Sequence, residues 1–575
     1  MNNEINVEKG NIIPKEKDKF GGYISRLVLN NNTEITINES DIVVFVGPNN
    51  VGKSQSLKDI YQLCEGKKTS IVIKDIEIVK RKGDIFKLLD SISTVNDYGS
   101  YKGYSGFRFS VSSYDISGYN SEQYYKNTRS LFVTYLDTLN RLTISNPAPL
   151  ITRKDTKNHP IHYAAFEQNS RKWLSDNFEE AFGKKLIPYI LNGGNIPLCI
   201  GNAVNFNKEE FADEQERQEE YAKVLDTYEQ VQNQGDGIKS FTGILLYLMI
   251  DHYCTYLIDE PESFLHPPQA NIMGRIIGKT LRINQQAFIS THSEEIIKGL
   301  LDVCPERVKI IRVTRDDNDN KFSVLANERV SSVWNDPLLK YSNIMTSLFH
   351  KEVILCESDS DCKMYSVIDN RIKQSQGRYS ETLFIHCGGK HRMAKIAKSL
   401  RSLDVCVKLI PDMDVLNDEN VFKEILEAFN IEWDSVKKSY NMIVSNLHSP
   451  KERIHKNDVK ACIEKICKQT NKEYLSNNEI KEIKTSISTI SKWDEIKKRG
   501  VSALSAGDST QEYKKMDSVL KKEGIFIVPV GELECFIKDV GGHGPEWTNT
   551  VLEKFPDLDD DVYKEIKDFV KMVCQ

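Results

Sequence analysis

A glycine-rich loop near the start of the chain has the residue types needed to bind a polyphosphate. Residues 47–54, GPNNVGKS, match the pattern G-x-x-x-x-G-K-[ST] in full. Glycines let successive backbone N–H groups point at phosphate oxygens, and a following helix adds the positive end of its dipole. The apolar run 41–46 before the loop predicts a buried strand. The residues expected to contact a nucleotide are Gly47, Asn49, Asn50, Gly52, Lys53 and Ser54, and Ser54 is also expected to hold Mg²⁺.

A second apolar run, 256–258, ends in acids and predicts the catalytic partner of this loop. Asp259, at the end of the expected strand, is a candidate Mg²⁺ ligand through water, and Glu260 is a candidate to polarise the attacking water. Further on, residues 287–291 predict another short strand, and His292 after it is expected to contact a γ-phosphate or the water. An acidic turn or a lone histidine is usually structural, but this order favours nucleotide hydrolysis.

Between these motifs, residues 235–240 read GDGIKS and precede an expected apolar helix over 243–250. A glycine-rich turn at the start of a helix favours an anion, because free N–H groups and the helix dipole both attract negative charge. Four residues of this segment are therefore candidates for nucleotide binding: Gly235, Gly237, Lys239 and Ser240.

The four segments GPNNVGKS, GDGIKS, YLIDEPESFLHP and ISTHS resemble, in order and in detail, the ATPases of the OLD (overcoming lysogenisation defect) family. This family also includes the nuclease subunit of Gabija defence systems. The resemblance covers about residues 20–345 and implies an ABC/SMC-type ATPase head. It further implies a homodimer or higher homo-oligomer, with ATP between the loop of one copy and the signature segment of another. That segment departs from the L-S-G-G-Q pattern of transporter ATPases.

Apolar runs in the C-terminal half also end in carboxylates. Glu357 and Asp361 follow the run 351–356, and Asp412 and Asp414 follow the run 405–410, with a glycine turn after 383–387 between them. This alternation fits a small parallel α/β sheet whose site lies at the carboxyl ends of the strands. Clustered carboxylates repel each other, so a hard divalent cation is the natural compensation. Mg²⁺ or Mn²⁺ there would activate water and stabilise the leaving oxygen of a phosphodiester.

The family resemblance extends to this half, because OLD-family heads are followed by a Toprim domain. Residues 353–361, VILCESDSD, resemble the Toprim opening V-E-G-x-x-D, with Ser358 in place of the glycine at some expected conformational cost. An expected strand at 524–530 is followed by G-E-L-E, which resembles the last acidic turn of these domains. The resemblance implies Glu532 and Glu534 as further metal ligands. It also implies a lysine that stabilises the pentavalent phosphate, for which Lys554 is our candidate.

The composition is that of a soluble globular protein of two or three domains. The chain has 575 residues, 39% hydrophobic and 28% charged, and a net charge of −6, which by itself does not indicate a nucleic-acid-binding protein. Its 12 cysteines form no C-x-x-C pair, which predicts reduced core thiols such as Cys254, Cys356 and Cys406. The polar N-terminus and the lack of a long apolar stretch predict a cytoplasmic protein with no membrane contact.

We therefore expect an α/β protein with the following organisation. Residues 1–20 form a flexible arm, 21–345 the ATPase domain, and 346–575 the Toprim domain. The first domain should contain a hairpin of strands 23–29 and 33–37, a strand over 106–111 and a helical region at about 172–234. The second should carry a lysine-rich helical insertion at about 416–522, either a solvated cap or a contact for DNA or RNA.

The function expected from these features is that of an ATP-binding, metal-dependent endonuclease acting in bacterial anti-phage defence. DNA is favoured over tRNA as the substrate, and a defence-system partner protein or a retron RNA or DNA is an expected associate. Two alternatives remain open: a Toprim ribonuclease that cuts tRNA, and an ATP-dependent sensor or scaffold whose Toprim fold binds without cutting. The sequence does not choose between them.

Overall fold

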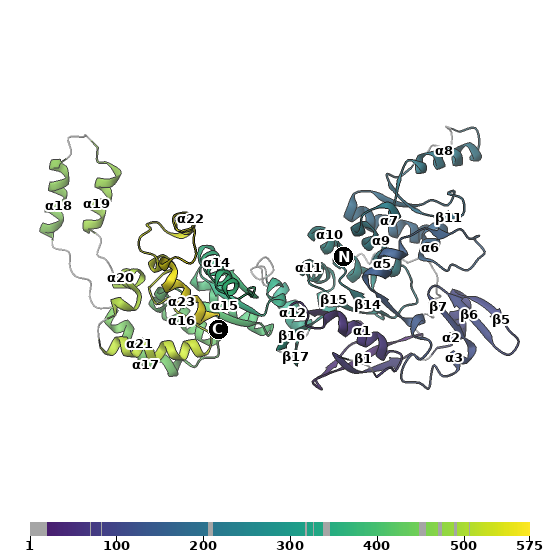
Figure 1. The fold of residues 1–575 in the computed structure, drawn as a ribbon, viewed down its shortest axis with the longest axis horizontal. Helices are drawn as coiled ribbons and strands as arrows, with labels where there is room; N and C mark the ends of the chain where they lie inside the picture. Colours follow the sequence, from purple (N-terminus) through teal and green to yellow (C-terminus); the bar gives the residue numbers. More distant parts are fainter. Residues whose placement is uncertain are drawn as a thin grey trace, which may run out of the picture. The chain divides into compact units, whose positions relative to one another are not determined.

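The computed structural model describes residues 20–68, 71–81, 83–204, 211–316, 319–325, 327–336, 345–447, 456–469, 474–487, 492–504 and 507–574. The arm expected at 1–20 lies almost wholly outside these residues. The chain divides into two compact units, residues 1–349 and 350–575. Each unit has its own sheet and its own core, and each is described separately (Figure 1).

A six-stranded sheet forms the centre of the first unit. Its strands, in spatial order, are β17 (Asp319–Leu325), β16 (Val308–Asp316), β3 (Ile42–Val46), β15 (Gln286–Ser290), β14 (Thr255–Asp259) and β8 (Val133–Leu136). Only β17 runs antiparallel to its neighbour. Every residue of β3 is buried, as expected for an apolar strand with neighbours on both sides. The carboxyl ends of β3, β14 and β15 therefore meet at one edge of the sheet.

Smaller antiparallel sheets and helices surround this core. The small sheets are β2 (Glu34–Thr36) with β1 (Gly22–Leu29) and β4 (Ile73–Lys80); β5 (Thr94–Asp97) with β6 (Lys102–Gly106) and β7 (Phe109–Ser112); β10 (Lys185–Pro188) with β12 (Leu198–Gly201) and β13 (Glu229–Gln230); and β11 (Asn195–Ile196) with β9 (Ala148–Pro149). The helices are α1 (Lys53–Leu63), α2 (Ile85–Ile92), α3 (Ser113–Ser117), α4 (Arg129–Phe132), α5 (Thr138–Ile144), α6 (Pro160–Phe166), α7 (Gln168–Phe182), α8 (Glu214–Asp226), α9 (Asp236–Leu248), α10 (Pro267–Thr280), α11 (Glu294–Val303) and α12 (Asn327–Trp334).

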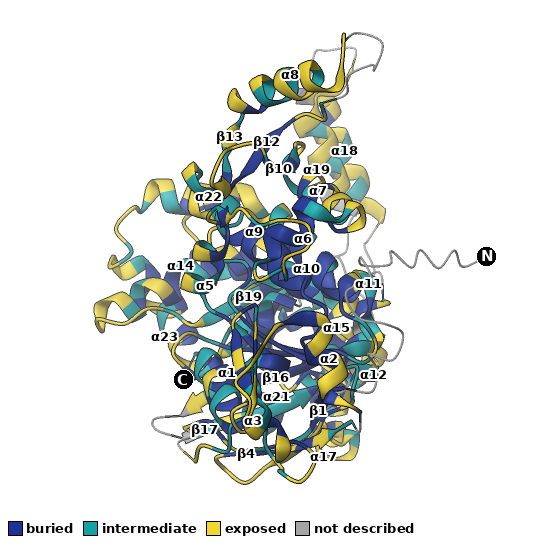
Figure 2. Ribbon diagram, turned by 90° about the vertical axis from the view of Figure 1, so that its right-hand side faces the viewer, coloured by how far each residue is buried: buried dark blue, intermediate teal, exposed yellow. Residues whose placement is uncertain are grey.

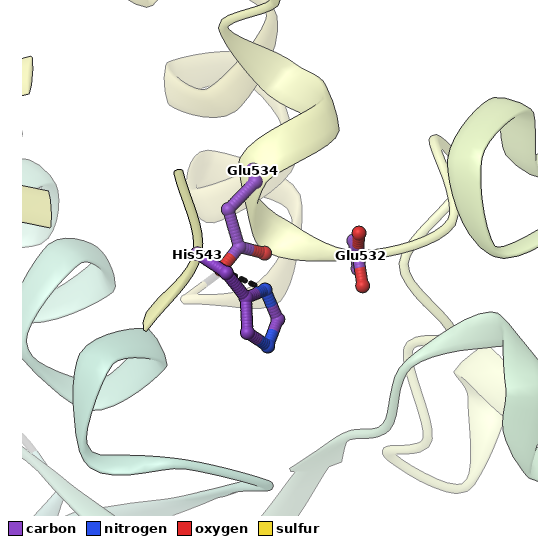
Figure 3. Close-up of side chains that lie close together, drawn as sticks. All are labelled: Glu532, Glu534 and His543. Atoms are coloured by element: carbon purple, nitrogen blue, oxygen red, sulfur yellow. Dashed lines mark ion pairs between the residues drawn. The ribbon is translucent and has the colours of Figure 1, made fainter. Parts of the chain in front are cut away.

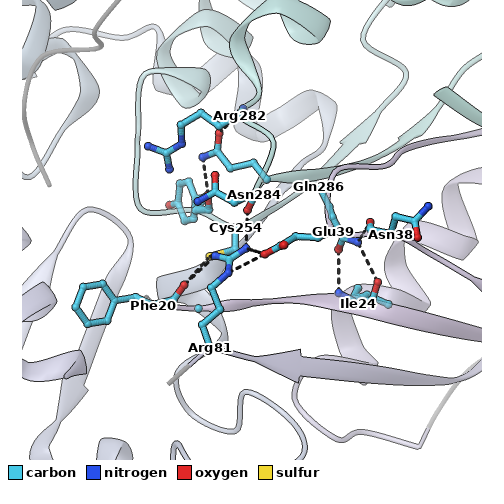
Figure 4. Close-up of polar contacts among 12 residues, drawn as sticks. Phe20, Ile24, Asn38, Glu39, Arg81, Cys254, Arg282, Asn284 and Gln286 are labelled. Carbon is cyan, nitrogen blue, oxygen red and sulfur yellow. Dashed lines mark hydrogen bonds and ion pairs between the residues drawn. The ribbon is translucent and has the colours of Figure 1, made fainter. Parts of the chain in front are cut away.

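Polar contacts join the β2-β1-β4 sheet to the central sheet (Figure 4). The Gln286 side chain at the start of β15 accepts a hydrogen bond from the Ile24 amide at 2.9 Å and donates one to the Ile24 carbonyl at 2.9 Å. The Arg81 guanidinium donates to the carbonyls of Phe20 and Asn284 at 3.0 and 2.8 Å. These buried contacts satisfy backbone groups that the strands leave unpaired, and they fix where the hairpin sits.

The predicted hairpin is confirmed, since β1 and β2 pair antiparallel, but two other sequence predictions for this unit were wrong. The expected strand over 106–111 is broken by a turn in which Arg108 has a φ of 56°, so β6 and β7 are separate strands. The expected helical region at about 172–234 does contain α7 and α8, but strands β10 to β12 lie between them. The sequence LCIG of β12 is wholly buried in a sheet, which no helical period predicts.

Helices α8 and α9 differ in how far they are buried, as Figure 2 shows. Helix α8 has one buried residue, Leu225, as expected for its highly charged sequence. Helix α9 is buried from Ser240 to Leu248 and packs against α5. At the contact, a Cβ added to Gly243 would lie 2.1 Å from the Arg141 carbonyl oxygen, so only glycine allows this close approach.

The second unit is built on a three-stranded parallel sheet of order β19-β18-β20. Its strands are β18 (Glu352–Cys356), β19 (Thr382–His386) and β20 (Cys406–Ile410). The expected strand at 524–530 is only a single bridge from Ile525 to Leu409, although Phe526 and Val528 donate backbone hydrogen bonds to the carbonyls of Leu409 and Pro411. The segment thus extends the sheet beside β20 without forming a regular strand.

Helices cover both faces of this sheet and form the insertion. They are α14 (Asp359–Ser375), α15 (Lys390–Ser402), α16 (Glu419–Ala428), α17 (Trp433–Leu447), α18 (Lys456–Gln469), α19 (Asn477–Ile487), α20 (Lys492–Arg499), α21 (Asp508–Lys522), α22 (Gly544–Lys554) and α23 (Lys564–Val573). The insertion from α16 to α21 is helical in its described parts, and α18 and α19 lie side by side (Figure 1). A buried cluster around Tyr365, Trp547 and Phe569 packs α14 on α22 and α23.

The cysteine prediction is confirmed for Cys254 and Cys356, which are buried free thiols, but Cys406 is exposed at the start of β20. None of the helices within the described ranges is long and apolar enough to cross a bilayer.

Candidate functional sites

The glycine-rich loop runs from the end of β3 to the start of α1. Gly47 has a φ of 138°, and a Cβ there would lie 2.0 Å from the Val313 carbonyl oxygen on β16, so the loop requires glycine at this position. Gly52 has a φ of 99° and immediately precedes α1. Asn49 and Asn50 are exposed, and Ser54 lies in the first turn of α1. This is the strand–loop–helix context in which the phosphate-binding pattern is meaningful.

Lys53 lies over the loop rather than in solvent. Its ammonium group donates to the carbonyls of Gly47 and Pro48 at 2.8 and 2.6 Å, and the residue is 5% exposed. Burial lowers the pKa of Lys53 to about 8, against the opposing effect of Glu260, Glu262 and Asp259. The structure thus brings the loop lysine close to the acids at the end of β14.

Asp259 is held from three neighbouring elements. Ser290, at the end of β15, donates a hydrogen bond to Oδ1, and the Tyr135 hydroxyl on β8 donates to Oδ2 at 3.3 Å. The fully buried Arg141 of α5 donates to the Asp259 carbonyl and makes longer hydrogen bonds, at 3.4 Å each, to the Leu136 carbonyl and the Thr138 hydroxyl. Tyr135 and Arg141 were not predicted from the sequence. The run FVTYLD, apolar and ending in an acid like YLIDE, was the available signal.

Glu260 and His292 face each other at the same edge. Their Oε1 and Nε2 atoms are 3.4 Å apart, and the Glu260 backbone has a φ of 48°, an uncommon conformation outside glycine that is found at functional sites. Burial, and then the Lys53 charge, lowers the pKa of His292, which favours the neutral imidazole at neutral pH. The His292 amide donates to Glu262 at 2.6 Å, so this turn is fixed as well.

The residues of the signature segment GDGIKS, 235–240, differ in their exposure. Gly235 is the exposed N-cap of α9, Gly237 packs against the Phe264 carbonyl, and the Lys239 side chain is 23% exposed. Ser240, in contrast, is fully buried, and its hydroxyl has no hydrogen-bond partner among the described residues. Helix α9 places it against the core of its own unit, and its expected role in nucleotide binding stays a prediction.

The carboxylates of the second unit gather at the carboxyl edge of its sheet. Glu357 follows β18, Asp412 and Asp414 follow β20, and Glu532 and Glu534 follow the extended segment beside β20. Asp361 lies in the first turn of α14, where Ser358 and Asp361 form a capping box. Ser358 has a φ of −122°, so the expected conformational cost of replacing glycine is absent, and serine caps the helix instead.

Their electrostatic coupling shows how closely these acids are packed. Burial raises the pKa of Asp412 well above its usual range, and the neighbouring Glu357, Asp361, Asp414 and Glu532 carboxylates raise it further. Burial is also the main cause of the raised pKa of Glu357, followed by Asp414. Burial also raises the pKa of Asp361, although the hydrogen bonds from Ser358 act to lower it.

Two lysines compensate part of this charge. Lys390 at the start of α15 is 3.3 Å from Asp414 Oδ2, and Lys497 of α20 is 3.3 Å from Glu532 Oε2. Burial alone would lower the pKa of Lys497, but Glu532 and Asp414 outweigh it and the pKa is raised. Lys554, our candidate from sequence, instead donates to the Asp539 carbonyl at 3.3 Å from the far end of α22, about 15 Å of helix from Gly544. Lys390 and Lys497 are therefore the cations beside the acids.

His543 joins this cluster and was not predicted as a site residue. Glu532, Glu534 and His543 each offer a ligand atom within 4.8 Å of the others. Figure 3 shows Glu534 and His543 pointing toward each other, with Nδ1 2.7 Å from Oε1. The Gly544 amide also donates to Glu534 at 2.7 Å. In the sequence, the position of H-G-P shortly after the G-E-L-E turn is the one feature that could have indicated His543 as a site residue.

The donor set fits a divalent cation. Glu357 Oε2 and Asp414 Oδ1 are buried and accept no hydrogen bond within the described part of the chain. Unpaired buried carboxylate oxygens are costly unless a cation satisfies them, and oxygen ligands suit Mg²⁺ and Mn²⁺. The residues that would hold the ion are Glu357, Asp361, Asp412, Asp414, Glu532 and Glu534.

Comparison with known proteins identifies a relative. No family model matches the chain. The Old nuclease of Escherichia phage P2 is 22% identical over 329 residues, 55% of this chain and 49% of that protein. The chain resembles the OLD family. An uncharacterized protein of Methanocaldococcus jannaschii is 38% identical over 69 residues, 12% of this chain and 60% of that one. The chain thus spans about half the length of the OLD-family relative.

Solved structures of SMC head domains also align with the chain. The SMC head bound to the C-terminal winged-helix domain of ScpA is 14% identical, covering 54% of this chain and all of that one, with a TM-score of 0.32. The SMC head of Thermotoga maritima is 12% identical, covering 52% and 98%, with a TM-score of 0.28. Overlaps at this level carry no argument, and the α/β class of this chain rests on its own sheets.

Proposed function

We propose that this chain is an ATP-binding, metal-dependent endonuclease that hydrolyses the phosphodiester bonds of DNA in bacterial anti-phage defence. The observation that best supports nuclease activity is the set of closely spaced, partly buried carboxylates at the carboxyl edge of the β19-β18-β20 sheet, two of which have buried oxygens without a hydrogen-bond partner among the described residues. Similarity to a protein named Old nuclease supports the same activity. Its role in defence comes from the family resemblance alone.

In the first unit, we assign ATP binding to the loop after β3. The backbone of Gly47 to Gly52 cradles the phosphates, Lys53 neutralises them, and Ser54 and Asp259 hold the Mg²⁺ that accompanies ATP. Glu260 orients the attacking water, and His292, 3.4 Å away, fixes the Glu260 carboxylate. Gly235, Gly237 and Lys239 at the start of α9 form the surface through which a second copy would complete the site.

In the second unit, the carboxylates bind the metal and the lysines orient them. A divalent cation held there activates water and stabilises the leaving oxygen. Lys390 and Lys497 each hold one carboxylate by an ion pair, and the remaining carboxylate oxygens would be available to bind a metal ion. Both lysines also lie where a scissile phosphate would gain from positive charge, a role that the family resemblance implies for Lys554.

Plasmid DNA and bulk tRNA, each incubated with Mg²⁺ or Mn²⁺ and with or without ATP, test this function. Glu357→Gln removes one charge of the cluster without changing its volume. Asp359→Asn, an exposed acid two residues away, is the matched control. We expect DNA cleavage by the wild type and the control, and at least a hundredfold loss in Glu357→Gln.

The other outcomes separate the alternatives. Cleavage of tRNA alone would move the substrate to RNA while keeping the site. Equal cleavage by Glu357→Gln and the control would place the chemistry elsewhere. If purified protein binds metal and ATP but cuts neither nucleic acid, the sensor or scaffold function is favoured.

A further inference from the structure

Helix α15, which leads away from the carboxylate site, carries positive charge and contains no acidic residue of its own. Its sequence, KHRMAKIAKSLRS, contains five lysines and arginines and no aspartate or glutamate, in a chain whose net charge is −6. Met393, Ile396, Ala397 and Leu400 are buried against the unit. Arg392, Lys395 and Lys398 are exposed, and their spacing of three residues places them along one face of the helix.

This charged face begins at the proposed metal site. The Lys390 ammonium, in the first turn, is 3.3 Å from Asp414 Oδ2, and the amide of Gly389 donates to the Glu357 carbonyl at 3.1 Å. The guanidinium of Arg392 lies back over the preceding turn, since a Cβ added to Gly388 would be 3.3 Å from its Nη1 atom. Arg392 therefore extends toward the edge of the sheet where the carboxylates lie.

Arg392 and Lys398 form no side-chain ion pair or hydrogen bond among the described residues. Some exposed lysines elsewhere in this unit do pair, as Lys423 does with Glu419 and Lys460 with Glu464. We propose that the exposed face of α15, through Arg392, Lys395 and Lys398, binds the phosphate backbone of the nucleic acid that the carboxylate site cuts. This inference rests on the proposed nuclease function and adds the path by which the strand reaches it.

The dimensions fit this role. Arg392 and Lys398 are six residues apart, which is about 9 Å along a helix. A duplex strand rises about 3.4 Å per phosphate, so the face covers about two to three phosphates next to the cut. Contacts of this kind carry no base specificity, which predicts binding that depends on salt rather than on sequence.

The test measures binding separately from cleavage. Fluorescence anisotropy of a labelled 30-base-pair duplex (and of labelled tRNA) in Ca²⁺, across a series of salt concentrations, compares wild type with the double variant Arg392→Glu/Lys398→Glu. The control is Lys514→Glu/Lys522→Glu, which reverses two exposed charges on α21. That helix ends at Lys522, just before the segment beside β20 begins, whereas the acids Glu532 and Glu534 follow the other end of that segment. Melting temperatures of all three proteins check folding.

We expect the α15 variant to bind at least tenfold more weakly, with the slope of log affinity against log salt reduced by about 2, and the control to change less than twofold. An equal loss in both variants, or no loss in the α15 variant while the wild type binds, would overturn the α15 inference and leave the nuclease intact. Wild type that binds neither nucleic acid would instead overturn the proposed function, and the α15 inference with it.

Discussion

The hydroxyl of Tyr135 donates a hydrogen bond to Oδ2 of Asp259 at 3.3 Å, across two strands that are far apart in the sequence. Its ring also packs against Tyr61 of α1, with ring centroids 5.6 Å apart, so Tyr135 connects the loop helix with the acid proposed to hold Mg²⁺. Burial and the neighbouring Asp259 carboxylate raise the pKa of Tyr135, so the hydroxyl stays protonated and donates.

From this relationship we predict that Tyr135→Phe weakens Mg²⁺-dependent ATP binding. The ring packing is kept, but Oδ2 of Asp259 loses its donor, and loss of an outer hydrogen bond to a metal ligand typically costs about tenfold in metal affinity. Binding of a fluorescent ATP analogue, titrated with Mg²⁺, measures the shift. Tyr61→Phe removes a hydroxyl from the same aromatic pair and should leave the Mg²⁺ dependence unchanged. If both variants shift equally, packing rather than the hydrogen bond explains the effect.

Asp412→Asn should make the second unit more stable without metal and unable to respond to metal. Asp412 is the carboxylate most affected by burial and by its acidic neighbours, so removing its charge relieves repulsion. A gain of about 1 kcal/mol corresponds to a rise of about 2–4 °C in melting temperature for a unit of this size. Differential scanning fluorimetry with EDTA and with Mn²⁺ would test this.

For Asp412→Asn, the matched control is again Asp359→Asn, an exposed acid outside the cluster. It should change the melting temperature in EDTA by less than 1 °C or so and retain the metal response. A fall in the metal-free stability of Asp412→Asn would contradict the electrostatic strain inferred here.

His543→Gln should reduce binding of Mn²⁺ more than binding of Mg²⁺. His543 lies 2.7 Å from Glu534, and an imidazole ligand favours first-row transition metals, whereas Mg²⁺ takes oxygen ligands. Calorimetric titration should show a loss of about tenfold for Mn²⁺ and little change for Mg²⁺. His386→Gln, at the carboxyl end of β19 but outside the Glu532 cluster, is the control. Equal losses for both metals would remove His543 from the ligand set.

The first unit should be sensitive to acid through His252. This side chain is buried without a partner for Nε2 among the described residues, and burial lowers its pKa to about 4. Between pH 6.5 and 4 the unfolded chain binds a proton that the folded chain does not, so stability falls as the pH falls. The loss at pH 5 is about 2 kcal/mol.

His252→Phe keeps an aromatic ring beside Phe109, 5.8 Å away, and removes the titrating group. The difference in melting temperature between pH 7.5 and pH 5 should therefore be smaller in His252→Phe than in wild type, whereas the exposed His391→Gln should behave like wild type. An unchanged difference in His252→Phe would show that other groups cause the acid sensitivity.

The parts of both sites that follow directly from a local sequence pattern could be predicted without the structure. A short apolar run precedes each of these parts: Gly47 to Ser54, Asp259, Glu357, Asp412 and Asp414. Such a run predicts a strand, and the residue after it then lies at the edge of the sheet. The prediction was weaker where local pattern is ambiguous. Residues 198–201 are apolar enough for a helix or a strand, and their pairing with β10 and β13 makes them a strand.

Only the tertiary structure shows which strands and which site residues lie next to one another. Which strands lie side by side depends on contacts between distant segments, so no local pattern shows that β8 lies beside β14 and brings Tyr135 and Arg141 to Asp259. Likewise, the return of the chain beside β20 brings Glu532 close to Asp412, and the packing of α15 and α20 brings Lys390 and Lys497 to the carboxylate site. Helix α22 places Lys554 at its last residue, where the ammonium group donates to the Asp539 carbonyl, and the catalytic role implied for Lys554 stays a prediction.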